Sequence, residues 1–125
     1  MVQSYIFFFL RCYEKKVCEH NLENQKTTIG ILYSTKLITK LTDQPVEIET
    51  TSIYGASWGE NVPLIKNSGI KILVVHKQIG SSKIFSRQED FIQADTFLEK
   101  NQNYDLILCG DCHQSFISTV NKKII

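Results

Sequence analysis

The stretch "GIKILVVHKQIG", residues 69–80, decides the fold class of this 125-residue chain. Its centre, residues 72–75, is a continuous apolar run of the kind found in strands that are buried on both faces of a sheet. A second run, "YDLILC" at residues 104–109, has the same character. Between the two runs, residues 88–99 place apolar side chains at helical spacing. Strand, helix and strand in this order predict an α/β core in which the two strands are parallel.

The remaining elements are predicted from shorter patterns. Residues 25–34 form a short helix, with Thr27 or Thr28 as the N-cap ahead of an apolar face. Alternation of apolar and polar residues indicates half-buried strands over much of the rest. The alternating segments are residues 36–41 and 46–51, continuing through 52–59. The apolar run at residues 5–10 predicts a buried or edge strand, and residues 115–120 and 123–125 are further strand candidates.

Composition narrows the class of protein. Fourteen basic and thirteen acidic residues leave a formal net charge of +1, which gives no overall electrostatic reason to expect nucleic acid or an acidic membrane as a partner. The apolar run at residues 5–10 is too short for a signal peptide or for the roughly 20 residues of a membrane span. We therefore expect a cytoplasmic, single-domain protein whose four cysteines stay reduced.

Two histidines and one aspartate follow the buried runs. His76 comes directly after residues 72–75, and His113 comes shortly after residues 106–108. Open α/β sheets place ligands at the carboxyl ends of their strands, so these side chains are expected at one edge. Asp111 lies two positions before His113 and can project in the same direction. The set predicts part of a transition-metal site, although such residues are also common at surfaces and in turns that bond only backbone amides.

The cysteines offer two rival interpretations. Cys109 and Cys112 form a C-x-x-C after a strand, as in thioredoxin-like redox domains, but the residues that follow favour a strand over the helix that such a site needs. A structural zinc site would add Cys12 and Cys18, whose spacing is awkward and which lie about ninety residues away. A redox pair predicts a shifted thiol pKa, whereas ordinary thiols titrate near ~8.5.

The two buried runs together carry a family resemblance. "IKILVVHKQI", followed about twenty-five residues later by "YDLILCGDCHQSF", resembles the last two metal motifs of calcineurin-like metallophosphoesterases. In that family a histidine ends one strand and a Gly-His-x-His turn ends the next. Some bacterial and phage-type members are similar in detail, with Asp in place of the first turn histidine. The resemblance extends from about residue 19 to residue 125, about five-sixths of the chain.

The resemblance implies a hydrolase that uses two divalent metals, manganese, iron or zinc, to cleave a phosphoester such as a nucleotide or a nucleic-acid phosphodiester. Carried over by motif position, His76 and Asp111 would bind one metal and His113 the other. Lys83 and Arg87, in the polar loop after the first strand, are weak candidates for contacts to the substrate phosphate. Solvated loop charges explain those two side chains equally simply.

The departures from the family pattern matter as much as the matches. The family's Asp-x-His, Gly-Asp-x-x-Asp and Gly-Asn-His motifs supply the bridging aspartate and the catalytic histidine, and none of them occurs ahead of His76. The catalytic residue is therefore unknown. The resemblance implies a partial α/β/β/α sandwich that lacks its N-terminal half: residues 1–18 would be a divergent extension and residues 19–125 the C-terminal half of the domain.

Two functions follow as alternatives. The first is a phosphoesterase fragment with a partial metal site and little or no activity of its own. The second is a non-catalytic remnant or scaffold that binds a partner. Losing the leading strands would leave one apolar face of the sheet uncovered, which predicts self-association or association with the missing half.

Overall fold

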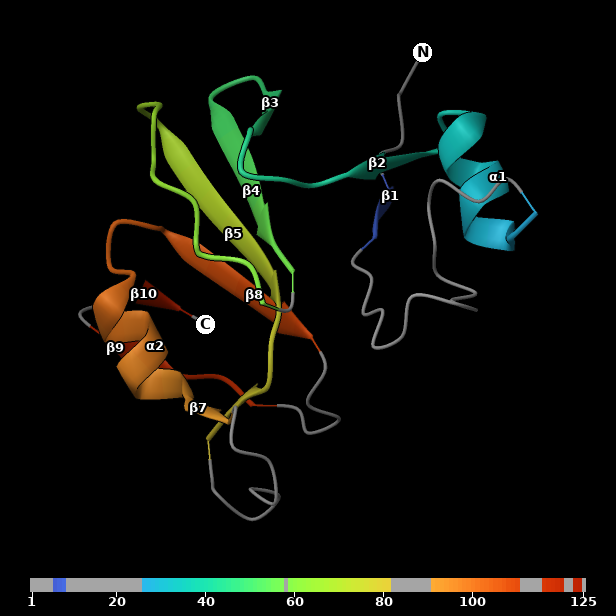
Figure 1. Cartoon of the computed structure of the whole chain (residues 1–125). Helices are drawn as coiled ribbons and strands as arrows, with labels where there is room; N and C mark the ends of the chain where they lie inside the picture. The colour runs from blue at the N-terminus through green and yellow to red at the C-terminus, as the bar shows by residue number, and fades with distance from the viewer. Residues whose placement is uncertain are drawn as a thin grey trace.

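The computed structural model describes residues 6–8, 26–57, 59–81, 91–110, 116–120 and 123–124. Over these residues the chain is an α/β protein with a mixed sheet and two helices (Figure 1). The elements are β1 (Ile6–Phe8), α1 (Thr28–Ser34), β2 (Ile38–Lys40), β3 (Val46–Ile48), β4 (Thr51–Ala56), β5 (Ile70–His76), β6 (Ile79–Gly80), β7 (Ile92–Gln93), α2 (Ala94–Lys100), β8 (Leu106–Gly110), β9 (Thr119–Val120) and β10 (Lys123–Ile124).

The main sheet has six strands in the order β3-β4-β5-β8-β10-β9. Its four inner strands are mutually parallel, and β3 and β9 add antiparallel edges. The parallel pairing predicted for the two apolar runs is confirmed, because β5 pairs with β8 from Ile72↔Leu106 to His76↔Gly110. The connection between them contains α2, so the predicted strand-helix-strand order is also confirmed.

One face of the sheet packs under α2. Tyr54, Leu73 and Ile107 lie in one row across β4, β5 and β8, and all three are fully buried. Helix α2 contributes Phe97 and Leu98 to the same cluster. Figure 1 shows this helix lying on one side of the sheet. Area burial of this kind is the main stabilising term of the fold.

Tyrosine hydroxyls tie the β4–β5 connection to this core. The rings of Tyr54 and Tyr104 meet edge to face, with centroids 5.6 Å apart. Tyr104 donates its hydroxyl to the carbonyl oxygen of Pro63 at 2.7 Å, and Tyr54 accepts from the backbone N–H of Lys66 at 3.1 Å. The described residues of this connection contain no helix, and the two tyrosine bonds help to hold it against the sheet.

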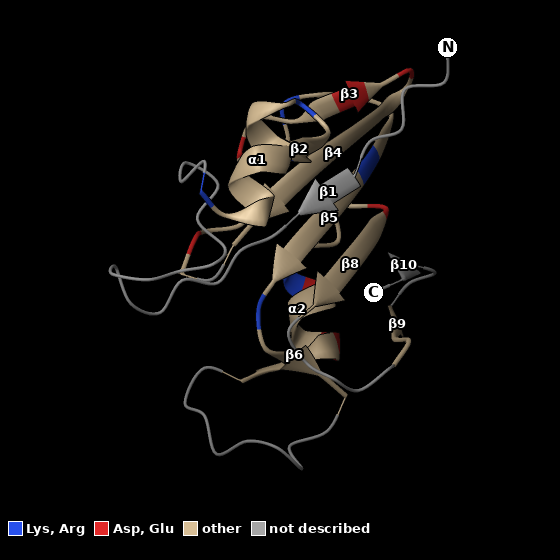
Figure 2. Ribbon diagram, turned by 90° about the vertical axis from the view of Figure 1, so that its right-hand side faces the viewer, with Lys and Arg blue, Asp and Glu red and all other residues tan. Residues whose placement is uncertain are grey.

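The opposite face of the sheet is apolar and only partly buried, which corrects the expectation that the two runs are buried on both faces. The side chains of β5 and β8 alternate between the faces, and Ile70 and Leu108 on the outer face are 51% and 50% exposed. Lys71 is the one Lys, Arg, Asp or Glu within β4, β5 and β8. Figure 2, where only the ends of these strands carry charge colours, shows the uncharged middle.

Two predicted boundaries are wrong. The strand predicted over residues 46–51 is a hairpin, because Glu49 takes a positive φ of 53° and the chain reverses there before β4 begins. The helix predicted over residues 88–99 begins at Ala94, because Ile92 and Gln93 form β7 and pair with β6 instead. The predicted residues 88–90 lie outside the described residues.

Helix α1, β1 and β2 form a small group to one side of the main sheet in Figure 1. The predicted helix and N-terminal strand are confirmed here, and the strand β1 pairs parallel to β2. Thr27 is the N-cap: its hydroxyl oxygen accepts from the N–H of Gly30 at 3.0 Å. Ile29 and Ile38 supply a small core of their own. Neither helix of the described chain is long and apolar enough to cross a membrane.

Candidate functional site

The carboxyl ends of β4, β5 and β8 lie together at one edge of the sheet. Ala56, Val75 and Cys109 are in register across the three strands, and the next pair is His76 with Gly110. Parallel strands end at a common edge, and ligands of open α/β sheets bind there. The sequence prediction that His76 ends its strand is confirmed.

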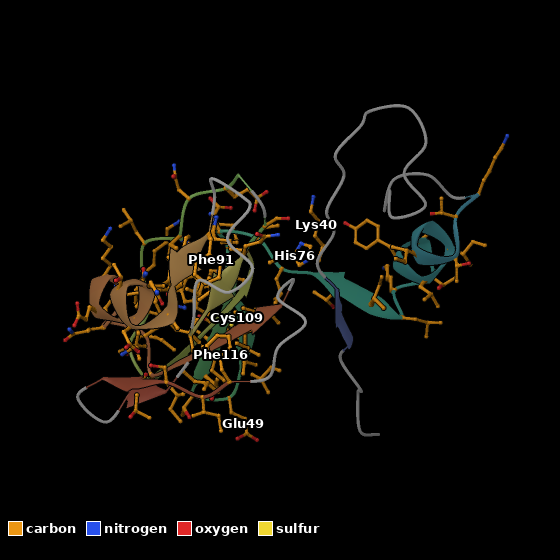
Figure 3. All side chains as sticks on the ribbon, turned by 90° about the horizontal axis from the view of Figure 1, so that it is seen from below. Lys40, Glu49, His76, Phe91, Cys109 and Phe116 are labelled. Carbon is orange, nitrogen blue, oxygen red and sulfur yellow. The ribbon has the colours of Figure 1, made fainter. Side chains whose placement is uncertain are left out.

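His76 points away from the α2 core. Val75 beside it is 1% exposed and belongs to the core cluster, so the adjacent side chain projects to the outer face. Figure 3 shows His76 on the side of the sheet opposite α2. The residue is half-buried and its Nδ1 atom is buried. Burial of Nδ1 leaves Nε2 as the ring nitrogen that a ligand can reach.

The other predicted metal ligands and phosphate contacts lie outside the described residues. In the sequence, Asp111 and His113 come after Gly110, the last residue of β8, and Lys83 and Arg87 come after β6. Asp111 is nevertheless bonded directly to Gly110, the register partner of His76. Across the described ranges, no group of three His, Cys, Asp or Glu side chains is placed to hold a metal.

Cys109 occupies the opposite face from His76. It is a half-buried thiol that packs against the core cluster next to α2, in register with Val75. Its would-be redox partner Cys112, together with Cys12 and Cys18 of the alternative zinc site, lies outside the described residues. A small side chain inside a packed strand is the ordinary role of a buried cysteine.

Sequence reasoning missed Lys77 at this edge. Its ammonium donates to the carbonyl oxygens of Ser57 at 3.2 Å and Glu60 at 2.6 Å. Those two residues close a turn directly after β4: Ser57 N–H donates to Glu60 Oε2 at 2.8 Å, and Glu60 N–H donates to the carbonyl oxygen of Ser57 at 3.1 Å. The only signal in the sequence was a lysine directly after a strand, which is ordinarily a solvated charge.

The lysine is partly removed from water. Burial lowers the pKa of Lys77 from its ordinary value, and the charge of Glu60 opposes that change. The ammonium keeps two carbonyl partners in place of solvent, which compensates for its desolvation. Lys77 therefore fastens the end of β5 to the turn that follows β4.

Comparisons with protein-family models, with curated proteins and with solved structures found no match to this chain. The order and pairing of the strands define the class of the chain as α/β with a mixed sheet. The resemblance to metallophosphoesterases rests on the motifs at residues 69–80 and 104–116 and stays a prediction.

Proposed function

We propose that this chain, which lacks the bridging aspartate of the two-metal family site, holds a single divalent metal ion through His76, Asp111 and His113, as part of a metallophosphoesterase-type site for a phosphoester. The observation that carries the proposal is the register of β5 with β8. It pairs His76 with Gly110, the residue directly before Asp111. Residues distant in sequence are thereby brought to the same edge, where a ligand set can converge.

The chemistry of the donors fits a metal such as Mn²⁺, Fe²⁺ or Zn²⁺. Imidazole and carboxylate are both ligands of these ions. A neutral histidine binds a metal through one ring nitrogen. Because Nδ1 of His76 is buried, Nε2 is the nitrogen that would bind the metal. When bound, a metal of this kind polarises a phosphoryl oxygen and lowers the pKa of water.

Hydrolysis by this chain alone is proposed to be weak or absent. In the family site a carboxylate bridges two metals, and the motif that would supply it does not occur ahead of His76. The test is turnover of bis-(p-nitrophenyl) phosphate with added MnCl₂. Robust turnover that His76→Ala abolishes would refute the proposed weakness and show a complete site.

Metal binding is tested separately from turnover. Asp111→Asn and His113→Ala are each expected to weaken Mn²⁺ binding at least about tenfold, as loss of one ligand from a three-ligand site should. Asp43→Asn is the matched control, since it removes the charge of an exposed carboxylate between β2 and β3. If all three variants bind Mn²⁺ like the wild type, Asp111 and His113 are not ligands.

The partly exposed outer face of the sheet favours a second candidate, a non-catalytic scaffold that associates with a second copy of itself. The outward-facing residues that precede His76 in β5 and Gly110 in β8 are all apolar. The same face of a second copy could therefore pack against them. Sedimentation velocity distinguishes this function. A concentration-dependent dimer that Leu108→Lys converts to monomer supports it, whereas a monomer at all concentrations refutes it.

A further inference from the structure

We infer that Lys77 is a positioning residue for His76: its ammonium fixes the end of β5 against the turn that Ser57 and Glu60 close. The inference rests on the proposed metal site and names the group that holds its first ligand in place. It uses a side chain that the family resemblance does not include.

The geometry forms a closed set of bonds. The Lys77 ammonium bonds two carbonyl oxygens of one turn, at Ser57 and Glu60. That turn is itself closed by the Glu60 carboxylate on the Ser57 N–H. Gly59 within it has a φ of +77°, a conformation that favours glycine. A turn closed by its own side chain and backbone is a firm anchor for the lysine.

The backbone after Lys77 is also held. Ile79 N–H donates to the carbonyl oxygen of Lys77 at 2.9 Å, and Ile92 N–H donates to that of Gln78 at 2.8 Å. Ile79 is fully buried in the core. The segment that leaves β5 is therefore fixed through its side chain on one side and through its carbonyls on the other.

The placement leaves His76 accessible. Lys77 is the first residue after β5, and its ammonium is bonded to the turn that Ser57 and Glu60 close, while His76 at the end of the strand projects to the outer face. A metal ligand needs such support, because a small displacement of its ring costs affinity. Lys77 does not itself contact the metal in this account.

The direction in which one substitution changes Mn²⁺ affinity distinguishes a positioning role of Lys77 from a purely electrostatic effect of its charge. Lys77→Met keeps most of the aliphatic stem and removes a positive charge. If the lysine acts only by charge, Mn²⁺ binding tightens, because repulsion of the cation is lost. If the lysine positions His76, Mn²⁺ binding weakens, on the order of tenfold.

The experiment is MnCl₂ titration of the full chain by electron paramagnetic resonance of free Mn²⁺. Lys77→Arg retains charge and donors and is expected to bind close to wild type. Lys66→Met is the matched control, because it removes an exposed lysine from the connection between β4 and β5, which also contains the anchored turn. Unchanged or tighter binding by Lys77→Met overturns the inference, as does failure of Lys77→Arg to restore affinity.

Hydrogen exchange tests the positioning role of Lys77 separately from the proposed metal site. Lys77→Met should speed exchange of the Glu60 amide, which bonds within the anchored turn, even without metal. An unchanged Glu60 rate overturns the inference alone. Mn²⁺ binding that survives His76→Ala unaltered overturns the proposed function, whatever the exchange rate.

Discussion

Replacing Tyr104 with phenylalanine should destabilise the protein more than its small change in volume suggests. The side chain is 0% exposed, and its hydroxyl donates to the carbonyl oxygen of Pro63 at 2.7 Å. Phenylalanine keeps the ring contact with Tyr54 but leaves a buried carbonyl without this donor. A lost hydrogen bond plus a desolvated acceptor costs about 2 kcal/mol of unfolding free energy.

Tyr54→Phe provides the internal comparison. Its hydroxyl accepts from the Lys66 N–H at 3.1 Å, a longer bond at a partly buried position. Water can replace the lost acceptor more readily there, so the expected cost is about 1 kcal/mol or less. The predicted order is a larger loss for Tyr104→Phe than for Tyr54→Phe.

The Tyr104 hydroxyl also makes stability depend on alkaline pH. Burial, with a smaller contribution from Tyr54, raises the pKa of Tyr104 to about 12, against roughly 10 in an unfolded chain. Between these values the folded state binds the proton and the unfolded state releases it. The contribution is therefore complete below pH ~10 and falls by about 1.4 kcal/mol per pH unit above it. Tyr104→Phe lacks this loss.

Urea unfolding at equilibrium, followed by tyrosine and tryptophan fluorescence, measures both effects. At about pH 8 the wild type should exceed Tyr104→Phe by about 2 kcal/mol, and at about pH 11 the gap should narrow. Other groups titrate in both proteins, so they cancel in the difference. A loss below ~0.5 kcal/mol at pH 8, or a gap that stays constant to pH 11, would refute the account of this bond.

Two paired substitutions test the packing of the sheet and one of its turns. Ile107→Ala, on the buried face, should cost roughly 2–5 kcal/mol in urea unfolding, whereas Leu108→Ala, half exposed on the other face, should cost under about 1 kcal/mol; equal costs would contradict the assigned faces. Gly69→Ala should cost more than Gly59→Ala by thermal unfolding: both have positive φ, but a Cβ at Gly69 would meet the Thr50 carbonyl oxygen at 2.4 Å, while that at Gly59 meets nothing within 4 Å. The reverse order would show that the close approach is absent.

The sequence predicted the centre of the fold because that region has strong local signals. Two apolar runs flanking a helical pattern suffice to place β5, α2 and β8 and to make the strands parallel. The histidine at the end of the first run was found for the same reason. The register that pairs His76 with Gly110 needed the structure, because it depends on contacts between distant segments.

Predictions failed where tertiary context decides between similar local options. Glu49 takes a positive φ that its residue type does not announce, so a hairpin replaced the single strand predicted at residues 46–51. Ile92 fits a helix by spacing, yet it pairs with Ile79 in β6 and delays the start of α2. A continuous run of apolar residues has the same sequence pattern whether one face of the strand is buried or both, so the half-exposed outer face could not be predicted from it.

The bonds that Lys77 makes could not be predicted from the sequence either. Its partners are two backbone carbonyls, which carry no side-chain signature, at Ser57 and Glu60. A lysine after a strand is usually solvated, so only the folded arrangement identifies it as an anchor. For the candidate site, the sequence pattern supplied the residue types at the strand ends, and the structure supplied the shared edge of β5 and β8 and the bonds of Lys77.

The most direct test of the central claim is Mn²⁺ affinity of the full chain with and without the His76 imidazole. If His76 is a metal ligand, the wild type and His20→Ala, which removes a histidine outside the proposed ligand set, bind MnCl₂ alike. His76→Ala then binds Mn²⁺ at least about tenfold more weakly. If His76→Ala binds Mn²⁺ as tightly as the wild type does, the carboxyl edge of β5 and β8 is not a metal site.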